Sequence, residues 1–115
     1  ILIAKGNPSL LTAPDQHGNT PLHEAATSGH WPMLACLVKK FEAPEYKKHR
    51  DQIDKQNNSG DTPLHLAFQF DHPDIVEFLV RKGADLAIEN NQGVTALQLG
   101  EGLGREDSLD ILRQA

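Results

Sequence analysis

The stretches TPLHEAATSGH, residues 20–30, and TPLHLAFQFDH, residues 62–72, decide how this chain folds. A third stretch, VTALQLGEGLGR at residues 94–105, aligns with them without gaps over its first half. Two residues ahead of the threonine of each stretch stands a glycine: Gly18, Gly60 and Gly93. The spacing from Gly60 to Gly93 gives a period of about 33 residues, and the spacing from Gly18 to Gly60 is longer by about nine. Such a period indicates repeated units that stack on one another.

Each unit begins with the residues of a tight turn followed by those of a helix. Gly18 and its equivalents follow polar residues, which favours a turn with positive φ. The threonine of each stretch can cap a helix through its hydroxyl, and the proline after Thr20 and Thr62 suits the first helical position. The residues expected to enter the core from these first helices are Leu22, Leu64 and Leu97. Gly29 and Asp71 are expected to end the first two of these helices in the left-handed conformation.

A second helix is predicted in each unit. Apolar residues recur at i, i+1, i+4 and i+5 in WPMLACLVKK, residues 31–40, and in PDIVEFLVRK, residues 73–82. Cys36 lies in the middle of the first of these helices in an apolar register, which predicts an inert packing thiol. Each unit is therefore a helix pair with an apolar face that it cannot bury alone, and stacking covers that face.

These residues resemble the ankyrin repeat. The TPLH tetrapeptide, the period of the glycines and the closing turn GAD at residues 83–85 carry the resemblance, which covers nearly the whole chain. It implies an all-α ankyrin-repeat solenoid of stacked helix–turn–helix units with β-turn fingers, about three repeats plus a partial N-terminal one. Residues 1–115 then form one ankyrin repeat domain. Its expected parts are the tail of a preceding repeat at 1–14, a repeat at 15–50 with an insertion near 41–52, a repeat at 53–86 and a divergent C-terminal repeat at 87–115.

Composition narrows the classes of function. Hydrophobic residues make up 38% of the chain and charged residues 23%, which is typical of a folded protein. A formal net charge of −5 disfavours a nucleic acid as partner. No apolar run reaches the length of a membrane span, so no membrane insertion is expected. The single cysteine cannot form an internal disulfide, which fits a cytoplasmic location, with the nucleus as the alternative.

The additional residues of the first unit fall in a basic segment. Residues 39–50 carry five basic residues against two acidic ones, a local charge of +3. The simplest interpretation is a solvated extension of the helix and its loop. The alternatives are a contact for an acidic partner, or a nucleic-acid site whose affinity should depend steeply on salt.

The patterns that usually indicate chemistry are weak in this sequence. His23 and His65 fall in successive units, unlike the two histidines of an HExxH zinc site, which share one helix. The resemblance implies that both form structural hydrogen bonds to loop backbone. GEGLG at residues 100–104 does not follow a buried strand, and its three glycines should weaken the helix by about 1 kcal/mol each relative to Ala. We therefore expect no catalytic residues, no cofactor, no metal site and no small-molecule substrate.

The resemblance places partner binding on a concave face formed by the fingers and the first helices. The positions that the structural pattern leaves free are the candidates for contact with another protein. They are Gln16, His17, Asn19, Thr27, Ser28, Asn58, Ser59, Asp61, Gln69, Phe70, Asn91, Gln92 and Val94. Phe70 matches an exposed register, where an aromatic side chain can anchor an interface, but it could also pack under the weak third repeat. Trp31 is expected to pack between repeats rather than to face a partner.

The leading functional prediction is a protein–protein interaction module that serves as adaptor, inhibitor or targeting element. The extended second helix and the divergent last repeat also resemble the ankyrin inhibitors of NF-kappaB transcription factors, and an array that a pathogen injects into host cells would look similar. The alternative from another class is a segment that recruits substrate to the catalytic domain of a larger enzyme. Fold resemblance leaves these open, because partner identity depends on the variable positions.

Overall fold

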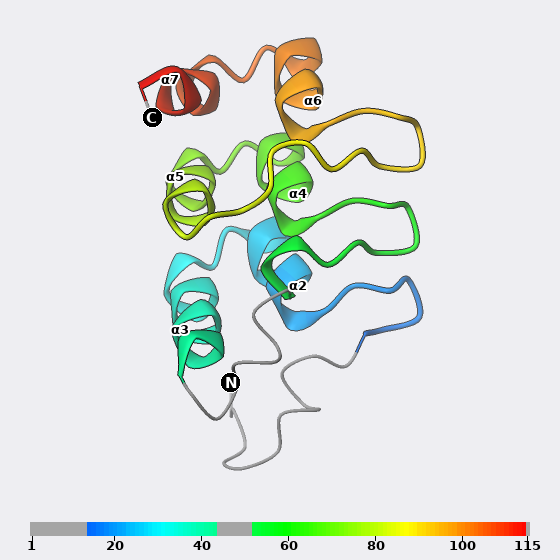
Figure 1. Ribbon diagram of the computed structural model, residues 1–115, viewed down its shortest axis with the longest axis vertical. Coiled ribbons are helices and arrows are strands. Elements are labelled where there is room, and N and C mark those ends of the chain that lie inside the picture. The colour runs from blue at the N-terminus through cyan, green and yellow to red at the C-terminus, as the bar shows by residue number, and fades with distance from the viewer. Residues whose placement is uncertain (1–13, 44–51, 115) are drawn as a thin grey trace.

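The described residues, 14–43 and 52–114 of the computed structural model, contain six helices in two rows (Figure 1). The inner row consists of α2 (Pro21–Ser28), α4 (Pro63–Gln69) and α6 (Ala96–Leu103). The outer row consists of α3 (Trp31–Glu42), α5 (Pro73–Arg81) and α7 (Glu106–Gln114). A hairpin-like finger projects to the right of Figure 1 ahead of each inner helix. The predicted all-α solenoid of stacked helix pairs with turn fingers is confirmed.

Parts of the predicted domain organisation fall outside the described residues. Nearly all of the expected tail at residues 1–14 lies there, as do residues 44–51 of the insertion. The bounds of the individual repeats therefore stay a prediction. The structure does describe the start of the insertion. Helix α3 ends at Glu42 and is longer at its C-terminal end than the equivalent helix α5, which ends at Arg81.

Each inner helix is capped by its threonine, as the sequence predicts, and the side chain at the third helical position completes a capping box. The N–H of Thr20 donates to His23 Nδ1 at 3.0 Å, and the Thr20 hydroxyl accepts from the N–H of His23. The second unit repeats this arrangement with Thr62 and His65. In the third unit Gln98 replaces the histidine, and its Oε1 still accepts the threonine N–H at 3.0 Å. Two backbone N–H groups that lack a helical partner are thereby satisfied in every unit.

The helix ends also follow the sequence. Gly29 and Asp71 adopt φ of 74° and 62°, and Gly83 adopts 90° after α5. The weakness expected from the glycines of residues 100–104 does not interrupt α6, which runs through Gly100 and ends before Gly104. No helix in the described part of the chain has the length and apolar character needed to cross a membrane.

Two burial predictions are wrong. Leu22 and Leu64 are 0% and 1% exposed, but Leu97 is 37% exposed. The helices of Leu22 and Leu64 are each followed in the stack by another inner helix that packs on them, whereas no described inner helix follows α6. Cys36 is exposed instead of packed. At 100° per residue it points about 160° away from Leu34, which is buried with the rest of the apolar stripe of α3.

A residue pair shapes the packing of α4 on α6. Phe68 is fully buried, and a methyl group at Gly100 would overlap its ring. At the equivalent positions of the preceding interface the chain has Ala26 and Ala67, both also buried. Gly100 therefore makes room for the larger side chain, which explains why a residue with poor helix propensity stands there.

Candidate functional site: a concave groove between fingers and inner helices

The three fingers share one turn geometry, held by a side chain at the base of each turn. Asp15 Oδ1 accepts the N–H groups of His17 and Asn19 at 2.8 and 2.9 Å. The equivalent oxygens of Asn57 and Asn90 accept the corresponding N–H groups of the second and third fingers. The glycine of each turn adopts positive φ, as predicted. Each finger thus has a fixed shape without support from a β-sheet.

Neighbouring fingers are joined by a ladder of hydrogen bonds. The Asn58 N–H donates to the carbonyl of His17 at 2.9 Å, and its side-chain amide donates to the carbonyl of Gln16 at 3.2 Å. Asn91 repeats both bonds one unit further along, to Ser59 and Asn58. This close approach leaves no room for a side chain at Gly18 or Gly60. The fingers therefore form one rigid surface.

The histidines of the TPLH motif tie each inner helix to the next finger. His23 Nε2 donates to the Asp61 carbonyl at 2.9 Å, and His65 Nε2 donates to the Val94 carbonyl at 2.8 Å. Burial lowers the pKa of His23, so that its ring stays neutral and Nδ1 remains an acceptor for Thr20. These contacts confirm the structural hydrogen bonds to loop backbone that the resemblance implies.

A concave groove of about 440 Å³ lies between the second and third fingers and the inner helices α4 and α6. Its walls combine polar finger residues with apolar residues from α6. The lining residues are Asn58, Ser59, Asp61, Gln69, Asn90, Asn91, Gln92, Leu99 and Leu103. Six of the thirteen predicted contact residues therefore meet in one groove.

The remaining predicted residues have different positions. Gln16, His17 and Ser28 are exposed or half-buried, as are Asn19 and Thr27, all in the first unit. Val94 lies at the base of the third finger, where its carbonyl accepts the bond from His65. Two of the predicted residues, Asn19 and Asp61, accept hydrogen bonds between neighbouring fingers. The Asn57 amide donates to the Asn19 side chain, and the Asn90 amide donates to the Asp61 carboxylate. Their contact with a partner stays a prediction.

The sequence prediction missed the two leucines of the groove. Leu103 is 44% exposed and stands one period after Phe70, at the same place in its unit. Leu99 likewise corresponds to Leu66 and to Glu24 of the earlier units. The alignment of the repeats therefore places both leucines on the concave face. The sequence prediction misses them because it treats the third unit as a divergent copy.

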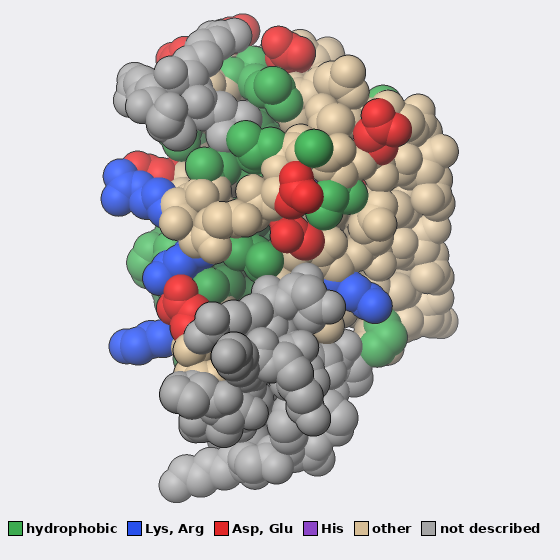
Figure 2. Space-filling model, viewed as in Figure 1, with side chains coloured by type: hydrophobic (Ala, Val, Ile, Leu, Met, Phe, Trp, Pro, Cys, Tyr) green, Lys and Arg blue, Asp and Glu red, His purple; other side chains and the backbone are tan. Residues whose placement is uncertain are grey.

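Acidic residues outnumber basic residues on the side of the fingers and inner helices. Over residues 14–29, 55–70 and 88–104, which make up the fingers and inner helices, five acidic residues stand against Lys55 alone. The outer helices α3, α5 and α7 contain six acidic residues against four basic ones, and side chains of both signs lie along the opposite edge in Figure 2. The finger side in that view is mostly uncharged, and its few charged residues are mainly acidic. A partner of the fingers and inner helices therefore meets a negative potential.

One pair of carboxyl groups on this side is coupled. The N–H of Asn19 holds the pKa of Asp15 below its ordinary value. Partial burial raises the pKa of Glu24, and a hydrogen bond to the Asp15 carboxyl raises it further. Two carboxylates that close together repel each other when both are charged, so a cation beside them is favourable.

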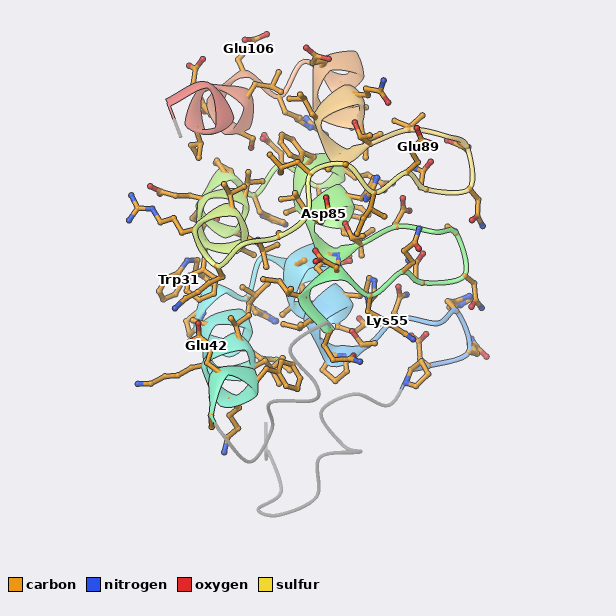
Figure 3. All side chains as sticks on the ribbon, in the orientation of Figure 1. Trp31, Glu42, Lys55, Asp85, Glu89 and Glu106 are labelled. Atoms are coloured by element: carbon orange, nitrogen blue, oxygen red, sulfur yellow. The ribbon has the colours of Figure 1, made fainter. Side chains whose placement is uncertain are left out.

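The two exposed aromatic residues differ in their surroundings. Phe70 is 45% exposed at the end of α4, which agrees with the exposed interpretation, but it lies outside the lining of the groove. Trp31 packs between repeats as predicted, edge to face with Phe78 at 5.6 Å between ring centroids. It is also partly exposed, on the side of the outer helices (Figure 3). Neither aromatic ring therefore contributes to the groove.

Within residues 14–43 and 52–114, no group of three or more His, Cys, Asp or Glu side chains could hold a metal ion. The basic segment can be followed only at its start. Lys39 is exposed and Lys40 half-buried on α3, while Lys47, Lys48 and Arg50 lie outside the described residues. The role predicted for that segment is not tested by these positions.

Comparisons with known proteins agree with the geometry. A family model described as ankyrin repeats (3 copies) matches residues 37–115, and one described as ankyrin repeat matches residues 17–46. The chain is 35% identical to the human B-cell lymphoma 3 protein over 79% of its own length and 19% of that protein. It is 32% identical to the nuclear factor NF-kappa-B p105 subunit of Rattus norvegicus over 90% of its length and 10% of that protein. It is also 32% identical to the tyrosine-protein kinase HTK16 of Hydra vulgaris over 100% of its length and 14% of that protein.

Proposed function

Because this chain belongs to the ankyrin repeat family, we propose that it is a protein–protein interaction module. It binds a partner protein through the concave face of its fingers and inner helices. The groove between the second and third fingers supports this proposal, since it brings together six of the contact residues that the resemblance to the ankyrin repeat predicts. The rigid finger ladder supports it too, because a surface that is already ordered loses little conformational entropy on binding.

The finer role that we propose is that of an adaptor, inhibitor or targeting element. Each of these roles requires only that a partner is held, and the shared geometry of the fingers supplies polar donors and acceptors for that purpose. The histidines of the two TPLH motifs, His23 and His65, are occupied by structural hydrogen bonds, which supports a role without catalysis. The acidic fingers support a protein rather than a nucleic acid as partner.

A second candidate is a segment that recruits substrate to the catalytic domain of a larger enzyme. The similarity to a tyrosine-protein kinase, which extends over the whole of this chain, favours it. The chain spans only 14% of that relative, so the catalytic part of such a protein would lie elsewhere. The binding surface would be the same in both cases. We propose the cytoplasm or the nucleus as the compartment, supported by the single, exposed Cys36.

The test compares two triple variants in the protein that contains this chain. The first replaces three groove residues, Ser59→Ala, Gln69→Ala and Gln92→Ala. The control replaces three residues of the outer helices, Glu77→Ala, Arg81→Ala and Asp107→Ala. Affinity capture from cells, followed by mass spectrometry, should show that the first variant loses partners that the wild type and the control retain. Unchanged capture by the groove variant, or a loss seen only with the control, would contradict the proposed face.

A further inference from the structure

The inner-helix part of the concave face changes from polar to apolar along the stack. At one repeat position the three units have Glu24, Leu66 and Leu99. Four residues later in each unit they have Ser28, Phe70 and Leu103. The first unit thus presents a carboxylate and a hydroxyl where the third presents two leucines. A partner that spans the face must match both ends.

The apolar end is an exposed patch within a polar surround. Leu103 is 44% exposed and Leu99 is half-buried, and both line the groove together with the side chains of Gln69 and Gln92. Apolar side chains surrounded by hydrogen-bonding groups are typical of a pocket for an anchoring residue. The described lining of the groove contains no Lys or Arg, and its one carboxylate, Asp61, accepts a bond from Asn90.

The polar end carries negative charge. Asp15 and Glu24 bring two carboxyl groups together, and the pKa of Glu24 is raised by burial and by its neighbour. A Lys or Arg from a partner would replace this unfavourable contact with an attractive one. The excess of acidic over basic residues on the fingers and inner helices acts in the same direction.

We propose that the partner is a protein segment with an apolar side chain for the Leu99–Leu103 end and a Lys or Arg for the Asp15–Glu24 end. This inference rests on the proposed function and specifies its ligand. The inner helices α2 and α6 are separated by two helix spacings of about 8–10 Å each, so the two ends lie about 16–20 Å apart. An extended segment advances about 3.3 Å per residue, which places the basic residue about five or six positions from the apolar one.

The test begins with a selection that assumes no partner. The 115-residue chain is immobilised and exposed to a phage-displayed library of random peptides of about twelve residues, long enough when extended to span both ends. The expected result is enrichment of peptides with an apolar residue and a Lys or Arg about five or six positions apart. Enriched peptides that are acidic, or that have no basic residue at this spacing, would overturn the inference.

Variants then assign the two ends to the two residues of the peptide. For a selected peptide, Leu103→Ser should weaken binding about tenfold, whereas the matched control Leu86→Ser should leave it unchanged. Leu86 is 40% exposed, close to the value for Leu103, but lies on the loop between α5 and the third finger. Equal losses with both variants, or no loss with Leu103→Ser, would contradict an apolar anchor at this site.

The charged end is tested by Glu24→Gln against Glu77→Gln, which removes the same charge from the outer helix α5. We expect Glu24→Gln to weaken binding about threefold and to reduce its dependence on salt between about 0.05 and 0.5 M, with no such change for Glu77→Gln. Identical salt dependence in both variants would overturn the charged contact. Circular dichroism of each variant shows whether the fold is retained.

The outcomes separate this inference from the proposed function. If no peptide is enriched, the inference fails, while the proposed function still stands or falls on the capture experiment with the groove variant. If peptides of the expected kind are enriched and respond to Leu103→Ser, but capture of cellular partners is unaffected by the groove variant, the inference about the groove holds and the proposed face of the cellular interaction is wrong.

Discussion

The two interfaces between repeats both pack inner helices together and bind the carbonyls at the end of an inner helix, but they do so with different residues. Between the first and second units, small residues meet at Ala26 and Ala67, and His72 Nε2 donates to the Thr27 carbonyl at the end of α2 at 3.1 Å. Between the second and third units, the ring of Phe68 lies against Gly100. Arg105 takes the place of His72 in its unit and binds two carbonyls at the end of α4. The second interface therefore depends on two matched contacts, the Phe68 ring against Gly100 and Arg105 with the carbonyls at the end of α4.

The comparison shows how a repeat can diverge without losing its packing. A large side chain on α4 is matched by the smallest possible one on α6, so the distance between the helices can be kept. The carbonyls at the end of the inner helix are satisfied in both interfaces, by an imidazole in one and a guanidinium in the other. Divergence in sequence is thus not the same as weakness in structure.

The largest effect is expected from Phe68→Ala, which removes a fully buried ring from the second interface. Because Gly100 has no side chain to fill the space, we expect a loss of about 3–5 kcal/mol in the free energy of unfolding. Urea denaturation followed by circular dichroism measures it. The matched control is Phe70→Ala, which removes an exposed ring two residues away and should change stability by less than about 0.5 kcal/mol. Similar losses for both would show that the ring of Phe68 does not fill the interface.

The next effect is expected from Gly100→Ala. Alanine favours helix, but the new methyl group overlaps the Phe68 ring, so we expect a net destabilisation of about 1–3 kcal/mol. Combined with Phe68→Ala, the same change fills part of the cavity and recreates the pair of alanines of the first interface. The double variant should therefore lose less stability than the sum of the single losses, by about 0.5 kcal/mol or more. Strict additivity would contradict the proposed fit.

A smaller effect is expected from Arg105→Ala. The guanidinium donates to the carbonyls of Phe68 and Gln69 at 3.0 and 2.8 Å, and its loss leaves both without this donor. Because the side chain is partly exposed, we expect a loss of about 1–2 kcal/mol, less than for a fully buried charge-assisted pair. Arg105→His imitates His72 and should recover part of the loss. If Arg105→His is no more stable than Arg105→Ala in urea, the two residues do not have the same role.

The smallest effect is a pH dependence that arises in the first interface. Burial lowers the pKa of His23 below the ordinary value of 6.5, so below that pH the unfolded chain binds more protons at this residue than the folded chain. The contribution of His23 to stability is therefore complete above about pH 6.5 and declines as the pH falls. Urea denaturation from about pH 8 to 5 measures the decline.

The control for this prediction is already present in the chain. Gln98 forms the same cap as His23 with a side chain that does not titrate, so His23→Gln should reduce the loss of stability at low pH. A wild-type pH profile in His23→Gln would show that another group is responsible.

Much of the fold could be predicted because its determinants lie within one repeat. The capping boxes, the positive φ of Gly18 and Gly29 and the apolar stripes of the outer helices depend on residues a few positions apart. The repetition of these local patterns then required stacking. The resemblance to the ankyrin repeat predicted the finger and inner-helix positions of the candidate site, and six of them lie together in the groove.

The repeated unit and its capped helices could therefore be predicted from the sequence, since they follow from interactions along the chain. Which surfaces a neighbouring repeat covers becomes clear only in the folded stack. That is why Leu97 is exposed although its equivalents are buried, why Cys36 faces outward, and why Leu99 and Leu103 line a groove. Whether a side chain is buried depends on how the surfaces of two neighbouring units pack on each other. The sequence pattern of one unit does not specify the surface of its neighbour.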